Sequence, residues 1–185
     1  MNPEDDSEQT KQAKALSDSA ILERRSVALA RAIATGIEQK DQTSLVEFEL
    51  GGEHYAFESE TILRIMEVKN MTVLPSVPSF IAGVINMHGE IVMVIHLADY
   101  FNLRKQPIGN TTRIIVVEHS NIKIGVLVDA IVDMKRLDLS GLQTDLLMMS
   151  ENVAKIIKGV YQGKLIVLDI PKLILSKDII INQVG

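Results

Sequence analysis

Residues 74–97 read LPSVPSFIAGVINMHGEIVMVIHL, and this stretch decides the fold. Pro75 and Pro78 lack a backbone N–H and fix φ, so the stretch begins as extended chain or turn and not as helix. Apolar residues on both sides of His88-Gly89, including the run 91–95, predict a β-hairpin with a tight turn between its strands. The apolar residues that follow at one-turn spacing predict a short helix after the hairpin.

The chain has 185 residues, which suffices for one ordinary domain or two small lobes. Hydrophobic residues make up 46% and aromatic residues only 4%, so the predicted core is mainly aliphatic. The 24 acidic and 19 basic residues give a net charge of −5, which provides no electrostatic footprint for nucleic acid. We therefore expect no nucleic-acid partner.

No apolar run reaches the length of a transmembrane helix, and the acidic start of the chain is the opposite of a basic signal peptide. We expect no direct membrane insertion. The absence of cysteine excludes disulfides, thiol catalysis and cysteine-ligated metal, and it fits a reducing compartment. These features predict a cytoplasmic protein.

The start of the chain differs in composition from the rest. Residues 1–16 are polar and acidic and predict a disordered tail. Residues 17–40 predict a helical extension, with an amphipathic helix over about 17–35 whose apolar residues recur at helical spacing. Packing of this helix on its own domain is favoured over partner docking, because isolated amphipathic helices are marginally stable.

From residue 44 the pattern predicts strands. Apolar residues alternate on both sides of Gly51-Gly52, a pair suited to the positive φ of a hairpin turn. A short helix is expected over 60–66, capped by Ser59. A second hairpin is expected over 114–128, and extended chain continues to Leu139.

The remaining connections complete the domain organisation. The polar stretch 102–111 contains Pro107 and Gly109 and is the best internal boundary. Residues 140–152 are expected to form a loop in which 146–149 act as an apolar plug. Residues 177–185 are expected to be a C-terminal tail.

The last segment repeats the pattern of the central one. The later segment begins with Gly159-Val160, turns at Gly163 and continues as a buried run. The central segment begins with Gly83-Val84 and continues as the hairpin described above. Both segments end in a short helix. One supersecondary unit is therefore used twice. Two such units of short strands predict an all-β protein of two small β-barrels that share a core, with no sheet edge left open.

A search for catalytic chemistry finds no phosphate-binding glycine loop and no nucleophile elbow. The four histidines have no second histidine or carboxylate at helical metal-ligand spacing, so solvated or hydrogen-bonded histidines are expected. Glu47 and Glu49 are expected to face outward from a strand. We expect no enzyme and no cofactor; a small β-barrel hydrolase is the less favoured alternative.

The central stretch resembles the CheW family of coupling proteins, whose pattern is approximately L-P-x-x-P-x-F-I-x-G-V-I-N-L-R-G-x-I-V-P-V-I-D-L. The resemblance covers about 43–176 and includes LVEFELGGEHYAF, RIIVVEHSNIKIGVLVDAIVDM and IIKGVYQGKLIVLDIPKLI. It implies two five-stranded SH3-like barrels, here with short helices and an added N-terminal amphipathic helix, so that 43–176 form two intertwined lobes.

The resemblance also implies a function. CheW-like proteins are non-enzymatic adaptors that link the cytoplasmic tip of a methyl-accepting chemoreceptor to the regulatory domain of a CheA-type histidine kinase. Apolar barrel edges suit such binding, because they can accept a helix or a related barrel. The positions that the resemblance assigns to partner binding are Ile65, Val68, His88, Gly125 and Ile131.

Three residues depart from the family pattern. His88 replaces arginine, Met93 replaces proline and His96 replaces aspartate. Histidine has neither the fixed fork of donors nor the permanent charge of arginine, so a receptor contact through position 88 would be tuned differently. An adaptor of a divergent pathway, such as gliding or pilus motility, is the alternative. The hypothesis that His88 and His96 make binding sensitive to pH is less favoured than no such role.

Overall fold

The computed structural model describes residues 42–144 and 151–180. Apart from Gln42, these residues belong to the second of two units, Thr43–Gly185. The expected acidic tail, the N-terminal helix and the apolar plug at 146–149 lie outside the described residues.

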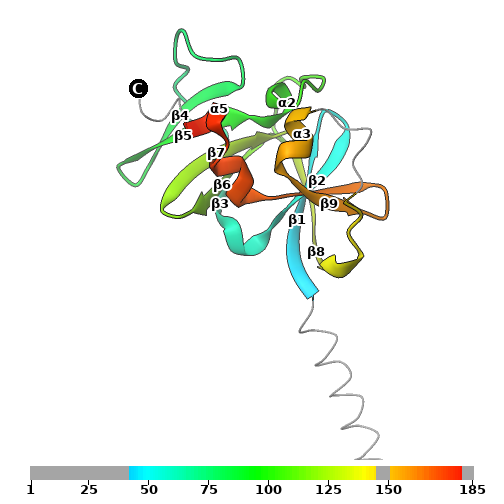
Figure 1. The fold of residues 1–185 in the computed structure, drawn as a ribbon. Helices are drawn as coiled ribbons and strands as arrows, with labels where there is room; N and C mark the ends of the chain where they lie inside the picture. The colour runs from blue at the N-terminus through cyan, green and yellow to red at the C-terminus, as the bar shows by residue number, and fades with distance from the viewer. Residues whose placement is uncertain (1–41, 145–150, 181–185) are drawn as a thin grey trace, which may run out of the picture. The chain divides into compact units, whose positions relative to one another are not determined.

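Ten strands make up most of the described chain (Figure 1). The strands are β1 (Gln42–Leu50), β2 (Glu53–Glu58), β3 (Ile62–Glu67), β4 (Ile81–Met87), β5 (Glu90–His96), β6 (Arg113–His119), β7 (Ile122–Val128), β8 (Ala130–Asp138), β9 (Ile157–Tyr161) and β10 (Leu165–Leu168). The short helices are η1 (Ser59–Thr61), α2 (Leu97–Tyr100), η2 (Leu139–Gly141), α3 (Glu151–Ile156), α4 (Ile170–Ile174) and α5 (Lys177–Ile180). The prediction of a mainly β protein with short helices is confirmed.

Four tight turns join hairpin strands where the sequence predicted them. Each turn places two consecutive residues at positive φ, at Gly51-Gly52, His88-Gly89, Ser120-Asn121 and Gln162-Gly163. Two positive φ values in succession match the right-handed twist of the flanking strands, which is why glycine, asparagine and similar residues occupy these turns. The turn chemistry therefore fixes the register of all four hairpins.

The strands form two five-stranded sheets, in the orders β8-β1-β2-β10-β9 and β3-β6-β7-β5-β4. In each sheet two hairpins meet through one parallel pair, β10 with β2 and β5 with β7. The two sheets thus have the same arrangement. Figure 1 shows the mixing of distant segments, because cyan strands from the start of the described chain lie beside orange strands from its end.

The two sequence repeats exchange strands between the sheets. The hairpin of β1 and β2 is completed by β8, β9 and β10, and the hairpin of β6 and β7 is completed by β3, β4 and β5. The polar stretch 102–111 lies between β5 and β6, which belong to the same sheet. This stretch therefore separates the two sequence repeats, but it does not separate the two sheets. The chain passes from one sheet to the other at 59–61, between β2 and β3, and again at Asp129, between β7 and β8.

A matching bridge ties together the edges of each sheet. Thr72, beyond β3, pairs with Val84 of β4, and Gln143, beyond β8, pairs with Val160 of β9. A glycine precedes the strand partner in both cases. A Cβ on Gly83 would lie 2.3 Å from the Thr72 carbonyl oxygen, and one on Gly159 would lie 2.8 Å from Leu142 Cβ. The glycines of the sequence repeat therefore admit the bridging chain.

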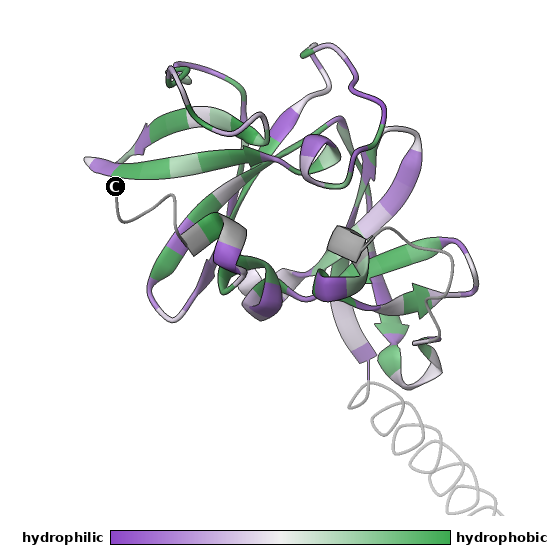
Figure 2. Ribbon diagram, turned by 45° about the horizontal axis from the view of Figure 1, so that its top comes forward, coloured by the Kyte–Doolittle hydropathy of each residue, from purple (hydrophilic) through white to green (hydrophobic). Residues whose placement is uncertain are grey.

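Apolar side chains on the strands pack into three clusters. The largest contains residues of both sheets, among them Phe48 and Phe57 of the first and Ile115 and Val126 of the second. A smaller cluster lies on the other face of each sheet, around Val94 in one and Val167 in the other. Figure 2 shows the hydrophobic residues concentrated in the strands. The expected shared core is present.

The prediction of a helix over 60–66 is wrong. Only the single turn η1 forms, and the chain continues as β3, which pairs with β6. Glu58, and not Ser59, occupies the N-cap position of η1, and the buried Ser59 Oγ has no hydrogen-bond partner among the described residues. The β-branched Ile62 and Ile65 fit a strand that gains ladder hydrogen bonds, and this pairing outweighs the local capping signal.

Candidate functional site

Two edge strands carry apolar side chains that face solvent. β3 is the edge of one sheet and β8 is the edge of the other. The exposed fractions are 48% for Leu63 and 39% for Ile65 on β3, and 44% for Val132 and 69% for Met134 on β8. Both strands also carry exposed charged residues, Arg64 on β3 and Asp133 and Arg136 on β8, which limit open strand pairing. The exposed apolar side chains beside them make the two edges candidate docking surfaces.

The two edge strands start in equivalent places. Ile62 begins β3 and Ile131 lies near the start of β8, and both pack against the core that the two sheets share. Farther along β8, Leu137 packs against the smaller apolar cluster around Val167, which belongs to the same sheet as β8. The exposed residues lie between these anchors, so the backbone beneath them is held at both ends.

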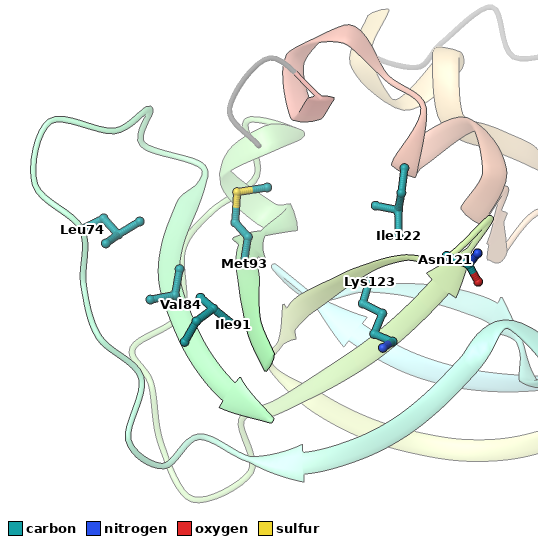
Figure 3. A pocket seen from close by; sticks show the side chains of 7 residues that line it. All are labelled: Leu74, Val84, Ile91, Met93, Asn121, Ile122 and Lys123. Atoms are coloured by element: carbon teal, nitrogen blue, oxygen red, sulfur yellow. The ribbon is translucent and has the colours of Figure 1, made fainter. Parts of the chain in front are cut away.

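A pocket of about 390 Å³ lies beside the β4–β5 hairpin (Figure 3). Its lining residues are Leu74, Val84, Ile91, Met93, Asn121, Ile122 and Lys123. Ile91 is 65% exposed, and Lys123 Nζ lies 2.5 Å from Glu90 Oε2 at the rim. A pocket lined by aliphatic side chains together with Asn121 and Lys123 suits a partner side chain that has both apolar and polar groups.

His88 lies at the tip of the same hairpin. It is exposed, and its φ of 56° is one that histidine adopts more readily than most residues. The Asn86 side chain accepts a hydrogen bond of 2.8 Å from the Gly89 backbone N–H and supports the turn. The imidazole is therefore presented to solvent from a fixed backbone.

The other positions assigned to partner binding divide between surface and core. Ile65 is exposed, whereas Val68 and Ile131 are half-buried and pack against apolar clusters. Gly125 is buried in β7, and a Cβ there would lie 3.0 Å from side-chain atoms of Ile114 and Val94. The space beside Gly125 is thus filled by the protein's own side chains.

Glu47 is a buried carboxylate in β1, contrary to the expectation that it faces outward. It is 5% exposed, and its Oε1 lies 2.6 Å from His54 Nδ1 while Oε2 pairs with Lys135. Burial acts to raise the pKa of Glu47, but Lys135 and His54 together hold it below its usual value. This network ties together β1, β2 and β8.

His96 is a buried histidine at the end of β5. Its side chain is 9% exposed, and its Nδ1 lies 3.4 Å from Asp99 Oδ2, which also pairs with Lys105 at 2.5 Å. Burial lowers the pKa of His96, and the nearby Asp99 opposes that shift only in part. The lowered pKa favours the neutral imidazole, which lies beside the Asp99–Lys105 ion pair.

The described residues contain no group of three or more His, Cys, Asp or Glu side chains placed to hold a metal ion. Of the buried polar groups described above, Glu47 pairs with Lys135 and contacts His54, and His96 lies beside the Asp99–Lys105 ion pair. Within residues 42–144 and 151–180, no helix has the length and apolarity needed to cross a bilayer.

Leu63, Ile91, Val132 and Met134 were not singled out from the sequence. The alternating apolar pattern marks them as strand residues, but the face that each presents depends on which strands become edges. Met134 is the most exposed of the four, at 69%.

These observations define a class: a small protein of two interlocked β-sheets whose exposed apolar edges and pocket suit the binding of other proteins. The chain belongs to the CheW family, because the model of the CheW-like domain matches residues 44–178. The resemblance seen in the sequence is thereby confirmed.

Individual relatives agree with this assignment. The chain is 29% identical to the chemotaxis protein CheW of Treponema pallidum, over 75% of this chain and 86% of the relative. It is similar to the crystal structure of the scaffolding protein TtCheW from Thermoanaerobacter tengcongensis, with a TM-score of 0.63, 27% identity and coverage of 69% and 84%. It is also 22% identical to protein PilI of Pseudomonas aeruginosa, over 76% and 79%.

Proposed function

We propose that this protein is a non-enzymatic adaptor that joins the cytoplasmic tip of a methyl-accepting chemoreceptor to the regulatory domain of a CheA-type histidine kinase. Membership of the CheW family supports the proposal. The observation that carries it is the pair of apolar edges on β3 and β8, because exposed apolar edges favour strand pairing or helix docking. The proposed location is the cytoplasm, and no cofactor is required.

The proposed receptor-binding surface contains Ile65 and Met134, with Val68 and Ile131 supporting it from below. The proposed kinase-binding surface is the pocket beside the β4–β5 hairpin. His88, exposed at the tip of that hairpin, is kept as a proposed receptor contact. Gly125 contributes through the packing of β7 and not through direct contact. We further infer that each sheet closes as an SH3-like barrel through its edge bridge, at Thr72 in one and Gln143 in the other.

An adaptor of a divergent chemosensory pathway, with a gliding, pilus or other kinase-controlled output, is the second candidate. His88, Met93 and His96 depart from the usual pattern of the family, and Met93 lines the proposed kinase-binding pocket. The chain is also similar to protein PilI, a relative that is not named CheW, and this similarity supports the second candidate. Binding to the kinase domains encoded in the same genome, tested one by one, separates the two candidates.

The experiment measures binding of the purified chain to a CheA regulatory domain and to a receptor cytoplasmic fragment from the same organism. Ile65→Glu and Met134→Glu place a charge on the two apolar edges and are expected to weaken receptor binding about tenfold or more. Ile108→Glu is the matched control, because Ile108 is 56% exposed but lies on neither edge. If the parent chain binds neither the kinase domain nor the receptor fragment, the adaptor proposal is wrong. If both edge variants bind the receptor fragment as the parent does, the proposed receptor-binding surface is wrong.

A further inference from the structure

We propose that a pocket among the short helices is a third protein-binding site, which takes an acidic segment of a partner through one bulky apolar side chain. The pocket has a volume of about 510 Å³ and lies between α2, α3, α4 and α5. Neither the proposed receptor surface nor the pocket beside the β4–β5 hairpin shares a lining residue with it. The proposal therefore goes beyond the adaptor function.

The floor of the pocket is formed by two residues of the core. Tyr100 is 4% exposed and Ile156 is fully buried, and both belong to the core shared by the two sheets. The Tyr100 ring also packs edge-on against Phe80, with 5.5 Å between centroids. Pro171 and Leu175 form the wall, and Leu175 is left 51% exposed. A preformed apolar floor with an exposed leucine beside it suits the insertion of an aliphatic or aromatic side chain.

The rim of the pocket is basic. Lys155, Lys172 and Lys177 line it, and none of the described lining residues is acidic. Asp169 lies nearby, with its carboxylate 3.3 Å from Lys172 Nζ, but it also caps α4 by accepting a hydrogen bond of 3.0 Å from the Lys172 backbone N–H. Lys172 is 55% exposed, so this pair is a weak surface pair that a partner carboxylate can replace.

Local charge and overall charge have opposite signs. The chain as a whole carries a net charge of −5, whereas this rim presents three lysines around one apolar opening. Long-range repulsion from an acidic protein disfavours nucleic acid or an anionic membrane, which would need a wider basic face. A partner with one apolar anchor and a few flanking carboxylates matches the size and the charge of the site.

The test uses the full chain labelled with ¹⁵N and a helical peptide in which leucines on one face are flanked by glutamates. We expect saturable shifts of backbone amides in α4 and in the segment leading to α5, centred on Leu175. Matched peptides replace every glutamate by lysine or every leucine by serine, and neither is expected to produce these shifts. Shifts that are equal for the acidic and basic peptides, or no shifts with the acidic one, overturn the proposal.

Variants locate the site and its charge. Lys172→Glu combined with Lys177→Glu is expected to weaken peptide binding about tenfold or more, and Leu175→Ser is expected to weaken it without unfolding the chain. Lys69→Glu combined with Lys164→Glu changes the net charge equally at exposed positions outside the pocket and is expected to bind as the parent does. If both double variants lose peptide affinity equally, the attraction is non-specific and the proposal is overturned.

Two further probes separate other polyanions from a protein segment. Vesicles containing phosphatidylglycerol and a single-stranded oligouridine are titrated against the same labelled chain. Binding of either probe at α4 and α5, without binding of the acidic peptide, overturns the protein-segment assignment. The double variant Lys172→Glu, Lys177→Glu is expected to keep its affinity for the kinase regulatory domain, so failure of this proposal is distinguishable from failure of the adaptor proposal.

Discussion

Thr72 and Val84 exchange two backbone hydrogen bonds, of 2.9 and 2.8 Å, across the two edges of one sheet. Gln143 and Val160 do the same in the other sheet, with two hydrogen bonds of 2.9 Å. A two-bond bridge is short, but it occupies edge groups that would otherwise be open to pairing with another chain. Each bridge engages one residue of the opposite edge strand, Val84 of β4 or Val160 of β9, and in the described part of the chain no strand lies on the outer side of β3 or β8.

Gly83→Ala is expected to destabilise the protein by about 2–4 kcal/mol. The new Cβ would lie 2.3 Å from the Thr72 carbonyl oxygen, and the φ of 151° is strained for alanine. Urea unfolding followed by circular dichroism measures the change. Gly141→Ala is the control, because nothing lies within 4 Å of its Cβ position. Equal midpoints for the two variants would show that the bridge does not constrain this position.

Glu47→Gln is expected to lower the free energy of unfolding at pH 7 by about 1–3 kcal/mol, because a buried group loses its charged partners Lys135 and His54. The pKa of Glu47 is lowered in the folded protein, so its charge stabilises the fold above the unfolded value of 4.5. That contribution is lost as pH falls through the folded pKa. The difference between parent and variant is therefore expected to shrink as the pH is lowered progressively below 4.5; a constant difference would contradict the assignment.

His96 is expected to make the protein less stable in mild acid. Its pKa is lowered from the unfolded value of 6.5, so the unfolded chain binds the proton more readily than the folded one. The free energy of unfolding should fall as pH drops below 6.5, until the folded pKa is passed. Asp99, Lys105 and Asp129 are the charged groups that act on it.

The variant His96→Gln tests this expectation by urea unfolding at several pH values between about 5 and 8. Removal of the buried imidazole is expected to flatten the pH dependence in that range. His88→Gln changes the same residue type on the exposed hairpin tip and is the control. Parallel pH profiles for the parent and His96→Gln would show that another group is responsible.

Gly125→Ala is expected to act on stability and not on partner affinity. Its Cβ would lie 3.0 Å from side chains of Ile114 and Val94, so the cost of overpacking is only partly offset by the gain of replacing glycine in a strand. We expect a net destabilisation of about 1 kcal/mol. Calorimetric titration with the kinase and receptor fragments at low temperature checks the affinity. A large loss of affinity without loss of stability would favour direct contact at Gly125.

Local patterns correctly predicted the hairpins and their turns. Residue pairs such as His88-Gly89 specify positive φ through their own chemistry, and the flanking alternation specifies strands. The same local reasoning failed at Ser59 and 60–66, where pairing of β3 with β6 outweighed the capping signal. It also failed at Glu47, because a strand pattern does not show which polar side chain will find buried partners.

The sequence by itself determined the strands, the tight turns, the repeated unit and the CheW-like family. Those features depend on neighbours within a few residues or on motif positions. Only the tertiary structure decided that the repeats exchange strands, that Gly125 lies in the core, and that β3 and β8 become apolar edges. Pairing between distant strands is selected by the burial of the whole chain, and no short stretch contains that information.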